Sequence, residues 1–216
     1  AFTDLPITVG DFSAAVTGLL LALILPASAP LWIGVIGGIF AIGIVKICFG
    51  GLGQNIVNPA LAARCFLLIS FAVHMTSYAC DAYSGATPLS AMKEGKIVDP
   101  YPMLLGTTGG CIGETSVIAI LAGAVLLLAL GIIRLRIPLT CLTVFSLMLV
   151  LFGGKGFDEV YLVSQVCGGG LMLATWFMAT DYVTSPVTKG GQYVYGAMIG
   201  VLAALFRLSG SAVEGI

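Results

Sequence analysis

The sequence contains few charged residues. Asp, Glu, Lys and Arg make up 9% of its 216 residues and hydrophobic residues make up 59%, whereas a soluble domain carries about a quarter charged residues. This excludes a water-facing surface over most of the chain. The formal net charge of −1 provides no basic surface, so we expect no nucleic acid as a partner. The composition predicts a membrane protein.

Potential metal ligands are scarce and scattered. The chain has one histidine, and its six cysteines stand singly, without a Cys-x-x-Cys pair to hold zinc or an iron–sulfur cluster. This excludes a multi-histidine metal site and a haem held by two histidines. We therefore expect no metal site, interpret the cysteines as small apolar packing residues, and assign no catalytic residue.

Long uncharged runs are abundant. They cover residues 12–45, 115–133, 137–154, 160–180 and 190–206. Each reaches or approaches the roughly 17 to 25 residues that a helix needs to cross the hydrocarbon core. These runs predict an all-α polytopic membrane protein.

The first run is too long for a single span. The segment Pro26-Ala27-Ser28-Ala29-Pro30 predicts a break between two helices. A second break at 55–59 precedes an apolar run at 60–73, which at 1.5 Å per residue covers only about 20 Å and predicts a short helix. The chain also ends in loops, so we expect a fragment that lacks terminal helices.

The two halves of the chain share motifs in the same order. Gly10-Asp11-x-Ser13 matches Gly113-Glu114-x-Ser116, Phe49-Gly50-Gly51 matches Phe152-Gly153-Gly154, and the break at 55–59 is echoed at 180–186. We interpret residues 1–75 as a partial first membrane repeat, 76–113 as an extramembrane loop, and 114–216 as a truncated second repeat.

Orientation follows from Lys and Arg, which accumulate on the cytoplasmic side. If Arg134 and Arg136 lie inside, then Asp11, Lys46 and Lys189 also lie inside and the 76–113 loop lies outside. The two repeats would then enter the membrane from opposite sides. This predicts inverted repeats, a plan in which short or broken helices meet and form the binding site.

The outer loop contains Asp81-Ala82-Tyr83-Ser84-Gly85-Ala86-Thr87-Pro88-Leu89. The small residues before Thr87 leave its hydroxyl sterically open, and Pro88 favours an extended backbone that projects the side chain. These residues by themselves fit an ordinary turn as well as a hydroxyl that a modifying enzyme can reach.

Ser84-Gly85-Ala86-Thr87 resembles the flavinylation motif in the membrane subunits of Rnf and Na⁺-translocating NADH:quinone oxidoreductase complexes. The resemblance continues, in the same order, through the motifs at 50–60, 113–116 and 179–188. It is nearest to the RnfD component of the Rnf complex, because the Ser185-Pro186-Val187-Thr188 ending and the compact loops differ from the longer NqrB component of the quinone reductase, which is the alternative.

The resemblance implies a flavoprotein subunit of an ion-translocating oxidoreductase in the cytoplasmic membrane. FMN would form a phosphoester with Thr87, within the motif made by Ser84, Gly85 and Ala86. The implied partners are the A, B, C, E and G components of the Rnf complex. The flavin transferase of that family acts outside the membrane, which agrees with the charge-based placement of Thr87. A second, noncovalent riboflavin is also implied.

Polar residues at the two breaks are candidates for a second site. An ionisable residue within a membrane is costly and usually functional, so we expect Asp181, with Thr180, Asn55 and Asn58, to bind an ion or the second flavin. For Asp181 the alternative is a hydrated carboxylate at a helix end. Two other function classes stay open: a solute channel or transporter without redox chemistry, and a structural membrane anchor.

Overall fold

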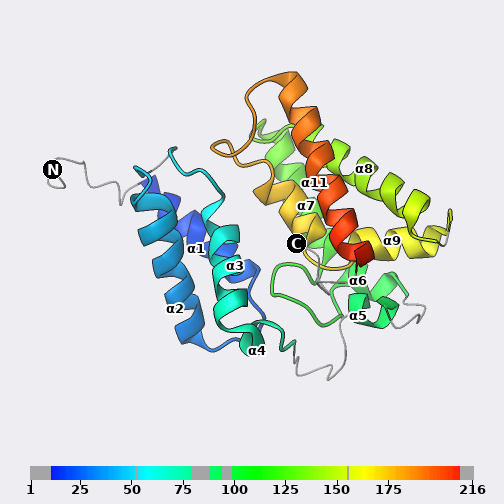
Figure 1. Cartoon of the computed structure of the whole chain (residues 1–216), viewed down its shortest axis with the longest axis horizontal. Coiled ribbons are helices and arrows are strands. Elements are labelled where there is room, and N and C mark those ends of the chain that lie inside the picture. Colours follow the sequence, from blue (N-terminus) through cyan, green and yellow to red (C-terminus); the bar gives the residue numbers. More distant parts are fainter. Residues whose placement is uncertain (1–10, 52, 79–87, 94–98, 155, 210–216) are drawn as a thin grey trace, which may run out of the picture.

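The computed structural model describes residues 11–51, 53–78, 88–93, 99–154 and 156–209. In these ranges the regular structure is helical, apart from an isolated β-bridge between Pro26 and Cys111. Figure 1 shows two groups of helices side by side, one formed by α1 to α4 and the other by α5 to α11. The predicted all-α fold class is confirmed. The four residues of the Thr87 motif lie outside the described residues.

The first group follows the predicted breaks. It consists of α1 (Ser13–Leu23), α2 (Leu31–Ile39) continuing into the π-helix η2 (Phe40–Ile47), α3 (Pro59–Ser70) and α4 (Ala72–Met75). Pro30 precedes α2 in an extended conformation, with φ −62° and ψ 145°, so the chain cannot continue one helix through this segment. The short helix predicted after the second break is α3, which begins at Pro59.

The second group contains longer helices and several short ones. Its elements are α5 (Pro88–Lys93), α6 (Tyr101–Leu105), α7 (Val117–Ala129), α8 (Arg136–Phe152), α9 (Glu159–Cys167), α10 (Leu171–Leu173), the π-helix η3 (Ala174–Met178) and α11 (Lys189–Ser209). Ser116 caps α7 by accepting from the Ala119 N–H, and Asp158 caps α9 by accepting from the N–H groups of Val160 and Tyr161.

The single helix predicted over 160–180 is wrong. The structure has two pieces, α9 and the α10–η3 segment, bent by 66°. Gly169 has φ 69°, a left-handed conformation that glycine adopts without strain. The guanidinium of Arg207 donates to the carbonyl oxygens of Gln165 and Gly168 at the end of α9, so carbonyls freed by the break are satisfied from α11.

The two groups share one core. The N–H of Gly113 donates to the carbonyl of Leu23 at 2.7 Å, and the N–H of Ile112 donates to the carbonyl of Leu25 at 3.1 Å. A cluster of buried side chains extends across both groups, including Leu21, Ile33, Leu67, Met103, Val117 and Met178. The break after α1 is therefore joined to the segment before α7.

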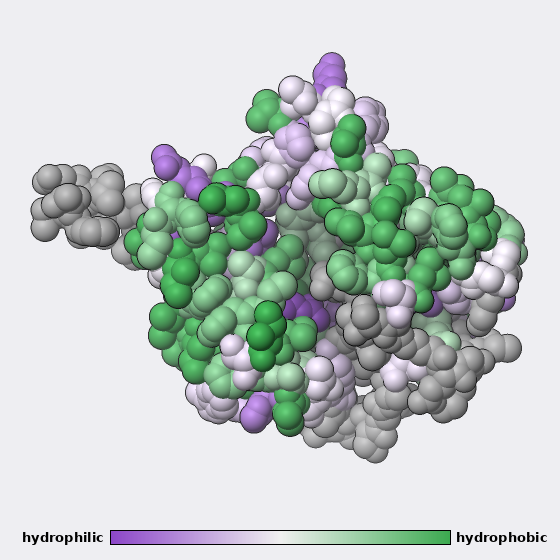
Figure 2. Space-filling view, viewed as in Figure 1, coloured by the Kyte–Doolittle hydropathy of each residue, from purple (hydrophilic) through white to green (hydrophobic). Residues whose placement is uncertain are grey.

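The surface of the described residues is strongly apolar. Within them, α11 is long and apolar enough to cross a membrane, and the bent pair of α9 with α10–η3 counts as a second candidate span. Figure 2 shows hydrophobic side chains over both helix groups, with hydrophilic residues gathered at the end where α11 begins. A chain with this surface buries its apolar side chains in lipid or against other proteins.

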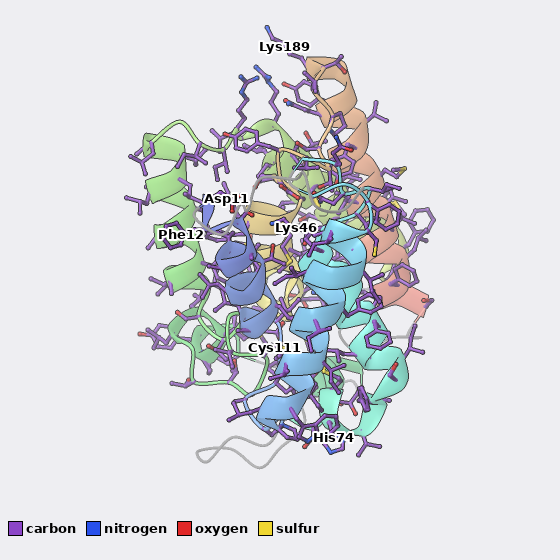
Figure 3. The ribbon with its side chains drawn as sticks, turned by 90° about the vertical axis from the view of Figure 1, so that its left-hand side faces the viewer. Asp11, Phe12, Lys46, His74, Cys111 and Lys189 are labelled. Atoms are coloured by element: carbon purple, nitrogen blue, oxygen red, sulfur yellow. The ribbon has the colours of Figure 1, made fainter. Side chains whose placement is uncertain are left out.

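The polar ends of the molecule can be identified in Figure 3. Asp11, Lys46 and Lys189 lie toward one end, while His74 lies at the opposite end and Cys111 between it and Lys46. Helices α5 and α6 lie toward the same end as α4, the helix that contains His74. Helices α5 and α6 thus lie toward the end of the molecule opposite Lys189.

Candidate functional site

A cavity of about 380 Å³ lies between the two helix groups. We call it the Asp181 cavity. Its polar lining residues come from α1, η2 and the breaks at 55–59 and 180–186, and they include Ser13, Thr17, Lys46, Asn55, Asn58, Thr180 and Asp181. The structure thus brings together all four residues that the sequence predicted for an ion or second flavin, although the two breaks are distant in the sequence.

Asn55 and Asn58 are both buried. The Oδ1 of Asn58 accepts from the N–H groups of Ala60 and Leu61, at 3.0 and 3.3 Å, and so caps α3. The Nδ2 of Asn55 donates to the carbonyl of Val57 at 3.1 Å. These bonds hold both side chains against the cavity and leave the amide oxygen of Asn55 able to accept from, or coordinate, a ligand.

Asp181 is half-buried where the chain leaves η3. Its carboxylate accepts from the Val183 N–H and from the Thr184 hydroxyl, each at 3.4 Å. Both distances are at the long end for hydrogen bonds, so the carboxylate retains lone pairs for a cation. The neighbouring Thr180 hydroxyl donates to the Trp176 carbonyl at 2.8 Å, which leaves its oxygen as an acceptor.

Sequence reasoning did not identify Lys46 as a lining residue. It placed Lys46 at a junction on the cytoplasmic side, whereas the structure buries its side chain, which is 7% exposed, in the cavity wall. Lys46 lies in η2, between the apolar residues Val45 and Ile47. An isolated lysine within an apolar run was the signal that could have found it.

Each half of the cavity adjoins a π-helix. η2 contributes Lys46 and precedes the break at 55–59, and η3 contributes Phe177 and precedes the break at 180–186. Such π-helical segments widen the helical turn and frequently occur at functional sites. In each half of the chain a π-helix is thus followed by a break.

Asp11 and Glu114, the acidic residues of the two matching sequence motifs, have different surroundings. Asp11 is exposed, and the Ser13 N–H, which donates to it at 2.9 Å, lowers the pKa of its carboxyl, with the nearby Lys46 charge contributing least. Glu114 is buried, and its Oε1 accepts from the Cys111 N–H at 2.8 Å. Both carboxylates thus accept hydrogen bonds from backbone N–H groups of their own segments.

A second, much smaller cavity lies beside the start of α5. It measures about 20 Å³ and is lined by Pro88, Leu89 and Glu114 together with the glycines at 109–110 and 168–169. A volume of this size holds about one water molecule.

Comparisons with known proteins identify the family of this chain. The family described as the NQR2, RnfD, RnfE family matches residues 2–216. The chain is 48% identical to the D component of a Na⁺-translocating ferredoxin:NAD⁺ oxidoreductase complex of Acetobacterium woodii, over 97% of this chain and 67% of the relative. It is 38% identical to the D component of a proton-translocating ferredoxin:NAD⁺ oxidoreductase complex of Clostridium ljungdahlii, over 98% and 69%.

A further relative is the D component of an ion-translocating oxidoreductase complex of Stutzerimonas stutzeri, 36% identical over 95% of this chain and 69% of the relative. The matches thus cover nearly the whole chain, including both breaks and the segment between the helix groups. The chain belongs to the NQR2, RnfD, RnfE family.

Proposed function

We propose that this chain is the RnfD component of a membrane-bound, ion-translocating ferredoxin:NAD⁺ oxidoreductase. The observation that carries the proposal is 48% identity, over 97% of the chain, to a protein named as the D component of such a complex. The relatives compared above share that designation, which favours this assignment over the NqrB component of a quinone reductase and over a channel without redox chemistry. Its partners are the A, B, C, E and G components implied by the family resemblance.

The chain carries FMN on Thr87 in this proposal. Support comes from the Ser84-Gly85-Ala86-Thr87 motif and from the position of Pro88, the next residue, at the start of α5. Helix α5 lies at the end of the molecule opposite Lys189, which fits attachment by a transferase on the outer side. The flavin, when bound, supplies electron transfer in single-electron steps.

Covalent attachment is tested by fluorescence after denaturing electrophoresis. The protein is produced together with its flavin transferase, and a fluorescent band whose peptide gains one FMN less one water is expected. Thr87→Ala removes both signals. The matched control is Thr107→Ala, in the same polar segment, because the Thr107 hydroxyl makes only a 3.4 Å bond to the Pro102 carbonyl. A dark wild-type band contradicts the flavin assignment.

The Asp181 cavity is the proposed binding site for the translocated ion. A carboxylate, an amide oxygen and hydroxyls are the oxygen ligands that small hard cations prefer, and Asp181, Asn55 and Thr180 provide them in the lining of one cavity. The alternative occupant is the second flavin. A volume of about 380 Å³ is within the range of small-molecule sites, roughly 300 to 1,000 Å³.

A neighbouring apolar cavity of about 420 Å³ offers a different place for that flavin. It shares Asn58 with the Asp181 cavity and is otherwise lined mainly by apolar side chains of α3, η3 and α11. If the ring occupies this apolar cavity, the polar cavity stays free for the ion. Replacement of Ala203, on its wall, by Trp would then lower the noncovalent flavin content of the purified complex without changing its Na⁺ dependence.

A further inference from the structure

Lys46 is a buried cation without a paired anion among the residues that the structure describes. Its side chain is 7% exposed and lines the Asp181 cavity. In the same part of the chain, Lys46 makes neither an ion pair nor a side-chain hydrogen bond. The Lys46 Nζ is not among the buried atoms that lack a partner in the described residues, so its ammonium group faces the cavity, where a negative group stabilises its charge.

Asp181 is the carboxylate that lines this cavity. Its two hydrogen bonds are both 3.4 Å long and come from Val183 and Thr184, on its own segment. Asp11, on which the Lys46 charge acts, is exposed and interacts mainly with Ser13. Lys46 from η2 and Asp181 from the break at 180–186 are therefore opposite charges on one cavity, contributed by the two halves of the chain.

We propose that Lys46 is a tethered counter-ion that competes with the translocated Na⁺ for the Asp181 carboxylate. The inference rests on the proposed function and adds a residue and a role to it. In the absence of Na⁺, the flexible lysine side chain reaches across the cavity and pairs with Asp181. When Na⁺ binds Asp181, the ammonium group withdraws, because two cations cannot share one carboxylate without strong repulsion.

This exchange has a consequence for transport. The cavity never holds an uncompensated carboxylate, whether Na⁺ is present or absent. An empty site can then pass through the apolar interior with no net charge, which lowers the cost of its return. Lys46 also weakens Na⁺ binding, so that the ion can be released.

The juxtaposition is tested by zero-length crosslinking of the purified complex. A carbodiimide activates the Asp181 carboxyl, the Lys46 amine attacks it, an amide bond forms, and the displaced oxygen leaves in the urea. Peptide mass spectrometry should detect a Lys46–Asp181 isopeptide in N-methylglucamine buffer and markedly less in Na⁺. Absence of the isopeptide, or a yield that Na⁺ does not change, overturns the proposal.

Crosslinking requires neither flavin nor electron transfer, so its failure is distinct from failure of the proposed function. A wild-type band without fluorescence, together with a Na⁺-sensitive crosslink, would contradict the attachment of FMN to Thr87 and support the role of Lys46 as a counter-ion. A fluorescent band without a crosslink would support the attachment of FMN and contradict the role of Lys46.

Variants of Lys46 give a second measurement. In vesicles carrying the complex, Lys46→Gln should lower the Na⁺ concentration for half-maximal ferredoxin:NAD⁺ activity by about tenfold, the factor that corresponds to 1.4 kcal/mol. Lys46→Arg keeps the charge and should stay near wild type. Lys189→Gln, an exposed lysine at the same end of the molecule, is the matched control and should have no effect. Equal half-saturation in Lys46→Gln and Lys189→Gln overturns the proposal, as does weaker Na⁺ binding in Lys46→Gln.

Discussion

At the scale of single residues, Asn58 combines a structural contact with a place in the site. Its Oδ1 caps α3, while the same side chain borders both larger cavities. Sequence alone predicted the site and not the cap. The two roles are separable, because aspartate can provide the same capping oxygen and alanine cannot.

We predict that Asn58→Ala lowers the free energy of unfolding by about 1 kcal/mol, since two N–H groups of α3 lose their acceptor. Asn58→Asp should keep the stability and alter only the Na⁺ dependence of activity, because it adds a charge beside the cavity. Thermal denaturation of the solubilised complex measures the first effect. Equal melting temperatures for wild type and Asn58→Ala would contradict the capping role.

At the scale of secondary-structure elements, α8 and α11 make a close helix contact. Gly196 and Gly200 on α11 face the backbone of α8, where a Cβ would lie 2.9 Å from the Ile137 carbonyl oxygen and 2.6 Å from that of Cys141. Small residues spaced four apart allow this approach in membrane helices. The contact fixes α11 and thereby Arg207, which satisfies the carbonyls at the end of α9.

We expect Gly200→Ala to destabilise the protein by about 2 kcal/mol, because the added methyl group meets backbone atoms that cannot move independently. Gly38→Ala is the control, since a Cβ at Gly38 would have no atom within 4 Å. Thermal denaturation of the two variants in the same detergent distinguishes them. Alanine in place of glycine favours a helix by propensity alone, so equal losses of stability in the two variants would contradict the packing argument.

At the scale of the whole molecule, the described residues have two distinct polar ends joined by an apolar surface. Lys189, Asp11 and Lys46 lie toward one end and His74 lies at the other. In our proposal the first end faces the cytoplasm, because lysine and arginine accumulate there. The flavin loop then faces outward.

This orientation predicts the labelling of introduced cysteines by a membrane-impermeant thiol reagent. Lys189→Cys should react in inverted vesicles and stay protected in right-side-out vesicles, and His74→Cys should show the opposite pattern, since both native residues are exposed. Mass spectrometry of the labelled peptides separates these sites from the native cysteines. The reverse pattern would place the flavin loop in the cytoplasm.

Much of the fold could be predicted because its signals are local. Proline at positions 26 and 30 and the Asn58-Pro59 pair mark breaks wherever they occur in a chain, and the uncharged runs identify the helices. The bend between α9 and α10 escaped prediction, because glycines at 168–170 are tolerated within apolar helices. Here the bend is stabilised by Arg207, almost forty residues later, through a contact that no local pattern contains.

The amino-acid sequence by itself determined the membrane class, the positions of the breaks and the family, because composition and short motifs carry that information. Tertiary structure decided which polar residues share a site. Asn55, Asn58, Thr180 and Asp181 were candidates from separate breaks, and only the packing of the two helix groups placed them around one cavity. The same packing buried Lys46 beside them, because burial depends on which helix face meets a neighbour and not on the residues that adjoin it in the chain.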